Sequence, residues 1–349
     1  MKAALQPLNR SASRDHPLPT GYDCGNGITK LVLGDIEIRC PSYFLSLHRD
    51  LYEVPANHQG GLVEYLDGCR EDLIGCRWLA GFPAYQKAPT AYFRTVDDKR
   101  GKLKFGLQML LGCLSTLPHR DRWTLFLATS VHDAKNFGAE FSALLAGNHT
   151  VRFNGHRQTS QVSITIDRVF EEGVGAIVTA RSEIDLNGQT LLYDFGNGTC
   201  IVSVFGLKGA LIERKVTPGG VEQLIDAIAS HIDMRRQQSA EGDRQIIRAG
   251  IEDKTFRYGT SSWNFRSLYQ TELVPWMQSA MAPALKAAAP WTPTSSAILA
   301  IGGGSELPTV RQLLIQKGII PVVDGALAHV RGLYRLAQAR LQEGGTWAQ

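Results

Sequence analysis

The chain has 349 residues, of which 44% are hydrophobic and 20% are charged, and its formal net charge is +4. This length suits about two domains with buried cores, and the small positive charge is far below that of a dedicated nucleic-acid-binding protein. The six cysteines form no C-x-x-C pair, which argues against a zinc site or a disulfide scaffold, and no stretch is apolar enough to span a membrane. These features indicate reduced thiols and a cytoplasmic location.

The first half of the chain predicts one α/β unit. Met1 to Pro19 is polar and basic and lacks the apolar core of a signal peptide, so we expect a flexible arm. Tyr22 to Arg39 predicts a β-hairpin, because apolar alternating segments flank a glycine-rich turn. Trp123 to Ser130 is typical of a buried strand, Phe137 to Ala146 has helical spacing, and Gln161 to Val169 predicts another strand.

The second half begins where the periodic pattern is interrupted. Small residues and carboxylates from Glu171 to Ala176 predict a crossing between two domains, and Leu191 to Phe205 predicts a second hairpin. Helices and strands then alternate. The expected helices are Val221 to Arg235, Asp243 to Gly250, Ser267 to Ala289, Pro308 to Gln316 and Ala326 to Gln342, and the expected strands are Ser296 to Ile301 and Gly318 to Val323.

The most informative pattern is the string Asp-x-Gly-Asn-Gly, which occurs in both predicted hairpins. Glycine adopts positive φ and lets a ligand approach the backbone, and successive N–H groups in such a turn bind anions. One copy alone would be an ordinary Asn-Gly turn, but two copies in matching contexts suit a nucleotide phosphate chain with Mg²⁺, which prefers oxygen ligands. We expect Gly25, Asn26, Gly27, Gly196, Asn197 and Gly198 to bind the phosphates, and Asp23 and Asp194 to face the metal.

Two residues beside these turns suit the terminal phosphates. Lys30 follows the first turn, and its ammonium group can reach a β- or γ-phosphate, although a lysine on a strand can also simply face solvent. Thr199 follows the second turn and can donate its hydroxyl or amide group, although threonine is also a good strand residue.

A carboxylate pair at the crossing point suits the attack of water. Phosphoryl transfer to water needs a group that orients and polarises the nucleophile. Glu171 and Glu172 are adjacent there, and we prefer Glu172 for this catalytic role. The same pair could instead be a solvated helix cap.

A glycine run follows the predicted strand that ends at Ile301. Gly302, Gly303, Gly304 and Ser305 could form a generic turn, but the strand before them and the helix after them are typical of a nucleotide site. Bare backbone lets the flat face of an adenosine lie against it, and a helix N-terminus favours nearby phosphates.

These motifs, in this order and spacing, resemble the actin superfamily of ATPases, which includes actin, bacterial filament proteins, sugar kinases and the 70-kDa chaperones. Asp23 to Lys30 resembles the first phosphate loop, Asp194 to Thr199 the second, and Ile301 to Pro308 the adenosine loop. Phe170 to Ala176 resembles the first interdomain connection of the ParM-like bacterial actins, in which a glutamate or glutamine serves the attacking water. Glu172 stands at that position.

The resemblance implies an α/β, actin-like two-domain ATPase fold. Duplicated ribonuclease-H-like domains, each on a five-stranded sheet, would enclose the nucleotide and Mg²⁺. Residues 1–175 and 321–349 would form the first domain and residues 176–320 the second. Ala328 to Gly332 resembles the second interdomain connection, with His329 where asparagine is usual. A γ-phosphate held by both hairpins would draw the domains together until hydrolysis.

The resemblance also implies a function. A ParM-like protein would polymerise with Mg-ATP, or with Mg-GTP, and depolymerise after hydrolysis. It would segregate plasmid DNA through a separate small DNA-binding adaptor and its centromere-like DNA. A cytoskeletal filament for cell shape or positioning would have the same sequence features. A small-molecule kinase of the same superfamily is another alternative, with Asp133 as its candidate base, whereas a chaperone is not expected because few residues follow the adenosine loop.

Overall fold

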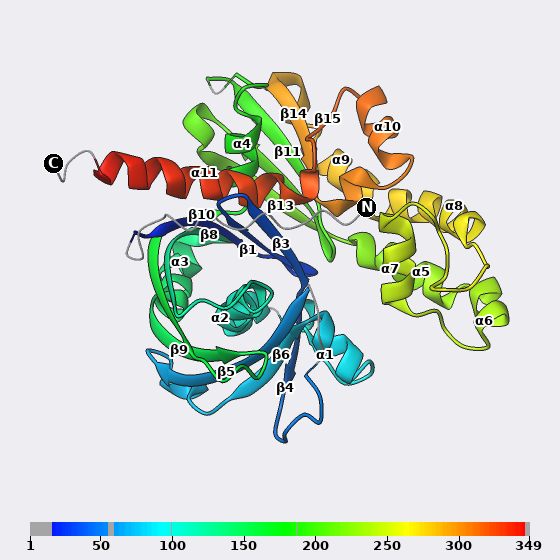
Figure 1. The fold of residues 1–349 in the computed structure, drawn as a ribbon. Coiled ribbons are helices and arrows are strands. Elements are labelled where there is room, and N and C mark those ends of the chain that lie inside the picture. Colours follow the sequence, from blue (N-terminus) through cyan, green and yellow to red (C-terminus); the bar gives the residue numbers. More distant parts are fainter. Residues whose placement is uncertain (1–15, 55–58, 99, 186, 346–349) are drawn as a thin grey trace.

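Two β-sheets organise the computed structural model, which describes residues 16–54, 59–98, 100–185 and 187–345 (Figure 1). In these ranges the first sheet has ten strands and the second has five. The first sheet runs in the order β3 (Ile36–Pro41), β2 (Ile28–Leu33), β1 (Leu18–Cys24), β8 (Arg122–Val131), β10 (Ser160–Glu171), β9 (Gly147–Phe153), β5 (Gly60–Gly68), β6 (Arg77–Gly81), β4 (Tyr43–Ser46) and β7 (Phe93–Arg94).

The expectation of a five-stranded first sheet is wrong for the described residues. The strands from β3 to β10 form such a unit, but β10 also pairs with β9, which pairs in turn with β5 from Val63 to Gly68, and these pairings add five further strands. The sheet therefore continues from the central strands into an outlying arm. That arm contains β4, β5, β6, β7 and the short helix α1 (Phe82–Lys87).

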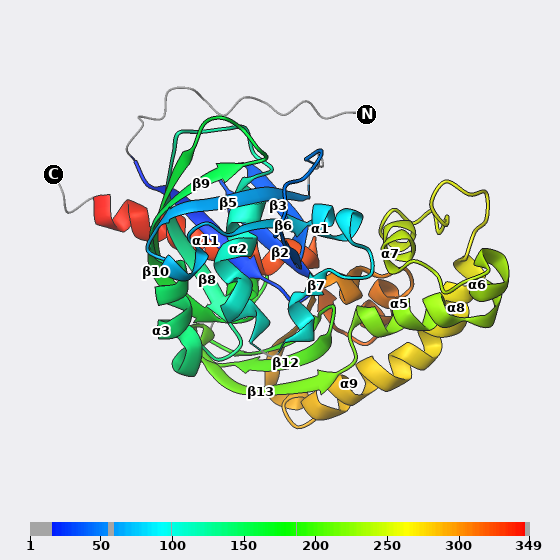
Figure 2. The same cartoon turned by 90° about the horizontal axis from the view of Figure 1, so that it is seen from below.

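Helix α2 (Gly101–Leu114) fills the interior of the first sheet. The sheet curves around the helix, and β1, β2, β5 and β6 all contact it (Figures 1 and 2). Leu107, Met109, Leu110 and Leu111 are fully buried although they lie on different sides of the helix. A helix that is apolar on every side is stable only inside a core. Helix α3 (Ala134–Leu145) packs against β8 and β10 and contacts α2, with Phe141 and Leu145 in the same core.

The second sheet carries its helices on one side in a separate hydrophobic core. Its strand order is β13 (Leu211–Pro218), β12 (Thr199–Phe205), β11 (Gln189–Phe195), β14 (Ser295–Ile301) and β15 (Ile320–Pro321). Leu224, Ile228 and Trp276 are buried in this core beside the strand residues Phe195 and Val202. The helices are α5 (Val221–Ser230), α6 (Ile232–Gln238), α7 (Arg244–Glu252), α8 (Arg266–Trp276), α9 (Ala282–Ala288) and α10 (Val310–Gln316).

Two helices join the halves. α4 (Val174–Ala180) leads from the first sheet to the second, and α11 (Gly325–Gly345) returns along β1 and β8 and contacts α4 (Figure 1). The two helices cross at Gly175 and Gly332. A Cβ atom on Gly332 would lie 1.8 Å from the Gly175 carbonyl oxygen, so the backbones touch here with no room for a side chain.

Most of the predicted elements are confirmed, and the differences have local causes. The helix expected from Val221 to Arg235 breaks at His231, whose backbone leaves the helical region and whose side chain caps α6. The helix expected from Ser267 to Ala289 is interrupted by a π-helical turn at Met277–Met281, just after Pro275. The strand expected from Gly318 to Val323 is limited to the two residues of β15.

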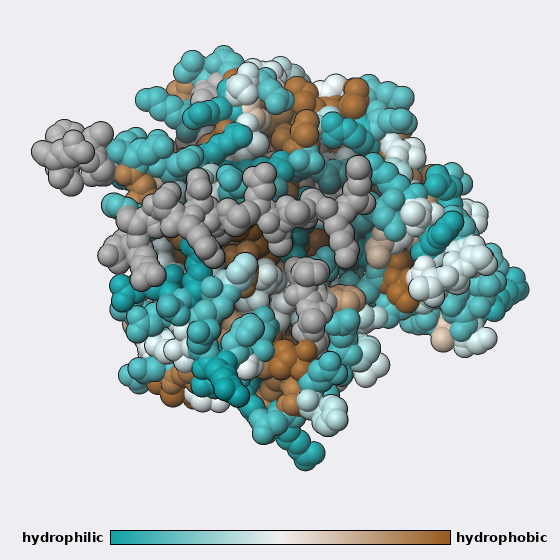
Figure 3. All heavy atoms as spheres, in the orientation of Figure 1, coloured by the Kyte–Doolittle hydropathy of each residue, from teal (hydrophilic) through white to brown (hydrophobic). Residues whose placement is uncertain are grey.

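Other predictions lie at the limits of the described residues. Residues 1–15 of the expected arm lie outside them, and Leu18 and Pro19 already belong to β1. Pro321 pairs with Ala300 in the second sheet, and the domain boundaries near residues 175 and 320 stay a prediction. The face in Figure 3 is mostly hydrophilic where it is coloured, with apolar side chains in small groups, as expected when apolar residues fill two cores.

Candidate nucleotide site

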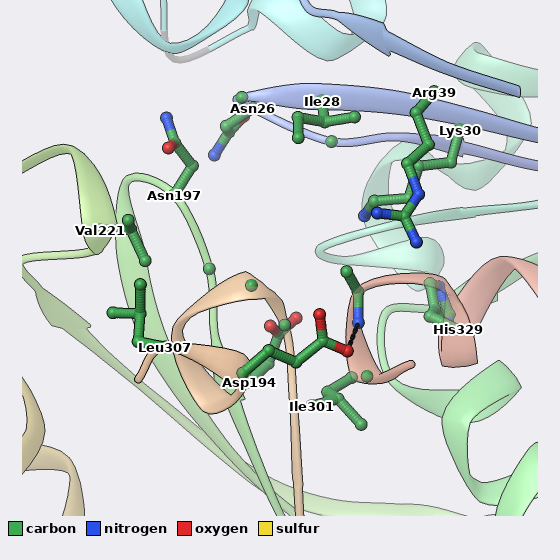
Figure 4. Close-up of a pocket in the computed structure, with 18 of the residues that line it drawn as sticks. Asn26, Ile28, Lys30, Arg39, Asp194, Asn197, Val221, Ile301, Leu307 and His329 are labelled. Carbon is green, nitrogen blue, oxygen red and sulfur yellow. Dashed lines mark hydrogen bonds between the residues drawn. The ribbon is translucent and has the colours of Figure 1, made fainter. Parts of the chain in front are cut away.

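A cavity of about 590 Å³ lies where the turns of the two hairpins meet. It is lined from the first sheet by the β1–β2 turn, and from the second by the β11–β12 turn and the loop after β14. Figure 4 shows Lys30 and Arg39 extending from neighbouring strands, with Asp194 and Ile301 on the opposite side. Its size and its polar groups suit a bound small molecule.

The first hairpin places a carboxylate and an ammonium group side by side. Asp23 and Lys30 are direct partners in the β1–β2 register, and Lys30 Nζ donates to Asp23 Oδ2 at 2.8 Å. Burial would raise the pKa of Asp23, but Lys30 and then His329 outweigh it and hold the pKa well below its usual range. Asp23 is therefore ionised, and its charge is balanced by Lys30.

The second hairpin places a carboxylate that has no such partner. Burial raises the pKa of Asp194 to about 6, although Lys30 acts in the opposite direction. Among the described residues, no hydrogen bond or ion pair engages its side chain. Gly302 (φ +83°) approaches this aspartate so closely that a Cβ atom on Gly302 would lie 2.5 Å from Asp194 Oδ1, and only glycine fits both the space and the dihedral angle.

The two hairpin turns touch each other. A Cβ atom on Gly27 would lie 2.4 Å from Cγ of Asn197, so the first turn has no room for a side chain. Asn197 is itself held, because Arg248 Nη2 donates to its Oδ1 at 2.8 Å and its Nδ2 donates to Glu222. Arg248 and Glu222 also form an ion pair. The second turn is therefore fixed from behind by a small charged network on α5 and α7.

Glu172 is held by a lysine from α2. Lys102 Nζ donates to Glu172 Oε1, and both side chains are largely buried and line the cavity. Burial would raise the pKa of Glu172, but Lys102 outweighs it and the net direction is down; the pKa of Lys102 is raised in turn, because its ion pair overcomes its burial. The pair is therefore ionised beside the hairpin carboxylates.

Glu171 has a different role. Its Oε1 accepts from the Ala134 amide at 2.8 Å, in the first turn of α3, and its Oε2 pairs with Arg214 at 2.9 Å. Arg214 lies on β13, so its ion pair with Glu171 joins the two sheets. Nη2 of Arg214 also donates to the Glu172 carbonyl oxygen at 2.6 Å. Glu171 is thus committed to structure, which leaves Glu172 as the carboxylate of the pair that faces the cavity.

His329 closes the inner end of the cavity from α11. Its Nε2 lies 2.7 Å from Oγ of Ser130, whereas its buried Nδ1 has no partner. Burial lowers the pKa of His329, so the ring is neutral at physiological pH. Its Nδ1 lies close to Gly175, where a Cβ atom would come within 2.9 Å of it, so the ring packs between β8 and the start of α4 at the edge of the cavity.

The predicted residues fall into two groups. Gly304 and Ser305 lie behind the glycine turn: Gly304 packs against Phe195, and the buried Ser305 hydroxyl donates to the Gly302 carbonyl oxygen at 2.8 Å, so we expect them to shape the turn. Asp133 caps α3 by accepting from the Asn136 amide and does not line the cavity. The predicted residues that line it are Asp23, Gly25, Asn26, Gly27, Lys30, Glu172, Asp194, Gly196, Asn197, Gly198, Thr199, Gly302 and Gly303.

Several cavity residues have no local sequence signal. Lys102 belongs to a helix that the sequence patterns do not predict, and Arg39 and Arg248 reach the cavity only through the pairing of β3 and the packing of α7. The register could have indicated Arg39, because it lies directly opposite Lys30. Within the described ranges, no three His, Cys, Asp or Glu side chains are grouped so as to hold a metal ion by themselves.

Comparison with known proteins identifies the fold. Residues 21–175 match the family of N-terminal domains of actin-like proteins. This part of the chain is an actin-like N-terminal domain. The first sheet from Gly21 onward, α2 and the β1–β2 hairpin lie within the matched segment. The predicted α/β, actin-like fold is confirmed, and the two sheets correspond to its two halves.

Solved structures agree with this fold over most of the chain. Bacillus thuringiensis ParM with ATP has a TM-score of 0.70 at 16% identity, covering 93% of this chain and 99% of that one. The archaeal actin homologue Ta0583 has a TM-score of 0.68 at 14% identity, covering 93% and 99%. A non-polymerisable quadruple mutant of pCBH ParM has a TM-score of 0.68 at 15% identity, covering 93% and 100%. A search among curated proteins finds no match. Among the described residues, no helix has the length and apolar character needed to cross a membrane.

Proposed function

We propose that this actin-like protein is a nucleotide-driven, filament-forming ATPase of the ParM type. The observation that carries the proposal is the meeting of both Asp-x-Gly-Asn-Gly turns at one cavity, with Glu172 held beside them by Lys102. Two glycine turns give a row of backbone N–H groups for phosphate oxygens, and the carboxylates and the lysines supply opposite charges at fixed positions.

The residues present fit a magnesium nucleotide. Asp194 is a carboxylate in the cavity without a cation of its own, and Asp23 faces the same space from the other hairpin. Mg²⁺ is usually held by one or two carboxylates together with phosphates and waters, which agrees with the lack of an all-protein metal cage. When bound, the ion would neutralise charge on the phosphates. The apolar Val221, Ile225 and Leu307 leave room for an adenine or a guanine base, and we place ATP first because a similar structure contains it.

Glu172 is the residue we assign to the attacking water. Its carboxylate is ionised, and Lys102 fixes its orientation. An oriented carboxylate can accept a hydrogen bond from water and polarise it toward the terminal phosphate, which would be held by both hairpins and by Lys30. Asp133, the candidate base of a sugar kinase, caps a helix outside the cavity, so the kinase alternative loses its catalytic residue.

Nucleotide turnover would control assembly of the chain with itself. A phosphate chain held by both turns joins the two sheets, and its cleavage would remove one of the links. We further propose a cytoplasmic filament that segregates plasmid DNA through a separate DNA-binding adaptor, in agreement with the small net charge of +4. A filament for cell shape would use the same chemistry.

Light scattering and phosphate release after addition of Mg-ATP or Mg-GTP test this proposal. We expect scattering to rise, phosphate to follow, and filaments to be visible by negative-stain microscopy. Glu172→Gln should still assemble but release phosphate slowly, leaving stable filaments. No nucleotide binding by the unaltered chain would refute the ATPase, and binding with hydrolysis but no assembly at any concentration would refute the filament. Normal phosphate release by Glu172→Gln would move the catalytic role to another residue.

A further inference from the structure

A row of charged side chains crosses the first three strands at the cavity. Asp23, Lys30 and Arg39 are successive partners in the register of β1, β2 and β3. Cross-strand partners share one face of a sheet, and the neighbours Ile38 and Cys40 point the other way into the core around α2. Both Lys30 and Arg39 line the cavity and extend into it (Figure 4).

Arg39 has no carboxylate partner in this row. Asp23 is occupied by Lys30. The carboxylate two residues away along the strand, Glu37, makes a bidentate pair with Arg331, at 2.6 and 2.9 Å. Arg331 also binds Asp324 on the cavity wall at 2.9 Å. In the described part of the chain, no hydrogen bond or ion pair holds the guanidinium group of Arg39, and its electrostatic neighbour is the carboxylate of Glu252, at the end of α7 on the same cavity wall.

A bound anion would complete this arrangement. Like charges directly opposite each other on neighbouring strands repel; Asp23 is paired with Lys30, whereas Arg39 is exposed and interacts with Glu252 without forming an ion pair. An arginine on an edge strand can serve to prevent strand pairing, and β3 is an edge strand. That explanation does not account for the direction of the Arg39 side chain into the cavity or for its position beside Lys30. A bound anion between the two cations accounts for both the direction and the position.

We infer that Arg39 binds the phosphate chain of the nucleotide, as a positioning residue that works with Lys30. This inference rests on the proposed nucleotide site and adds to it a ligand outside both glycine turns. The planar guanidinium group can donate two parallel hydrogen bonds to phosphate oxygens, which an ammonium group cannot do. Because β3 lies in the first sheet, Arg39 also fixes the phosphates to that half of the molecule.

Calorimetric titration with Mg-ATP, Mg-ADP and adenosine tests the inference. Arg39→Gln should raise the Kd of ATP and ADP by about 10- to 100-fold, the usual range for charge-assisted hydrogen bonds, and leave the Kd of adenosine unchanged. Arg39→Lys should recover part of the affinity, because it restores the charge without the paired donors. Arg236→Gln, on the exposed surface of α6, is the matched control and should change nothing.

The salt dependence gives a second readout. Loss of a phosphate contact should make the affinity of Arg39→Gln for ATP less sensitive to salt than that of the unaltered chain. Two results would overturn the inference and leave the proposed site intact. One is that Arg39→Gln loses the same affinity for adenosine as for ATP. The other is that Arg39→Gln has an unchanged melting temperature and an unchanged affinity for ATP. Absence of ATP and GTP binding by the unaltered chain would overturn the proposed function and the inference with it.

Discussion

At the scale of single residues, Asp194 combines a cost in stability with its proposed role in binding a cation. Burial raises its pKa to about 6, so the folded state holds this proton more tightly than the unfolded state does. The favourable contribution of the group is therefore complete at low pH and is lost as the pH rises through about 6. At neutral pH the carboxylate is ionised and uncompensated until a cation binds.

Asp194→Asn should therefore stabilise the nucleotide-free protein at neutral pH. We expect the free energy of unfolding to rise by about 1 to 2 kcal/mol, a value below the full effect of the pKa shift because water in the cavity screens the charge. The gain should disappear as the pH falls toward 4, where the native carboxyl is protonated as well. Urea denaturation across this pH range measures it. A destabilised variant at neutral pH would contradict the assigned environment, and retained stabilisation by Mg-ATP would remove Asp194 from the metal site.

Lys102 is the second residue whose role depends on its partner. It keeps Glu172 ionised and oriented, so Lys102→Met should slow phosphate release by about 100-fold, in the range of lost general-base catalysis, with a smaller change in nucleotide affinity. Lys104→Met is the matched control, because Lys104 lies two residues after Lys102 on α2 and its side chain is exposed. A malachite-green assay compares them. If Lys102→Met releases phosphate at the normal rate, or if Lys104→Met slows it equally, Lys102 has no specific role in the reaction.

At the scale of elements, local patterns predict the parts that are encoded locally. Both hairpins and the turn after β14 follow from glycine, asparagine and alternating residues, and the structure contains all three. Helix α2 could not be found in this way, because an apolar helix inside a curved sheet has no polar face to give a period. Lys102 was missed with its helix. Arg39 is visible in the sequence, but its place opposite Lys30 depends on the pairing of β2 with β3.

The crossing of α4 and α11 is an element contact that tolerates no side chain. Gly332→Ala would place a Cβ atom 1.8 Å from the Gly175 carbonyl oxygen, so the two helices must move apart. We expect a loss of about 3 kcal/mol or more in the free energy of unfolding, as for other overpacked backbone contacts. Gly138→Ala in α3 is the control: its nearest neighbour would lie at 3.6 Å, and it should be neutral or stabilising. Urea denaturation of both variants measures the difference. Equal stabilities would show that α4 and α11 can move apart at this contact without a loss of stability.

At the scale of the whole molecule, contacts beyond the nucleotide join the outlying arm of the first sheet to helices of the second half. Tyr85 on α1 donates to Asp243, which caps α7, and Gln245 donates to Tyr43 on β4. Arg94 on β7 lies 3.4 Å from Glu222, which belongs to the network behind Asn197. The two halves must therefore break these bonds in order to separate.

These bonds should slow the exchange of nucleotide. In a variant with both Tyr43→Phe and Tyr85→Phe, two hydrogen bonds between the halves are lost while the rings keep their packing. We expect dissociation of a fluorescent ADP analogue, followed by stopped flow, to accelerate by up to about 30-fold, since each of the two bonds contributes about 1 kcal/mol. Tyr65→Phe is the matched control, because that hydroxyl bonds only to His149 and Arg70 within the first half; it should lower stability without changing the dissociation rate. An unchanged rate in the double variant would mean that the halves separate elsewhere, and an equal acceleration in Tyr65→Phe would assign the effect to general loosening of the fold.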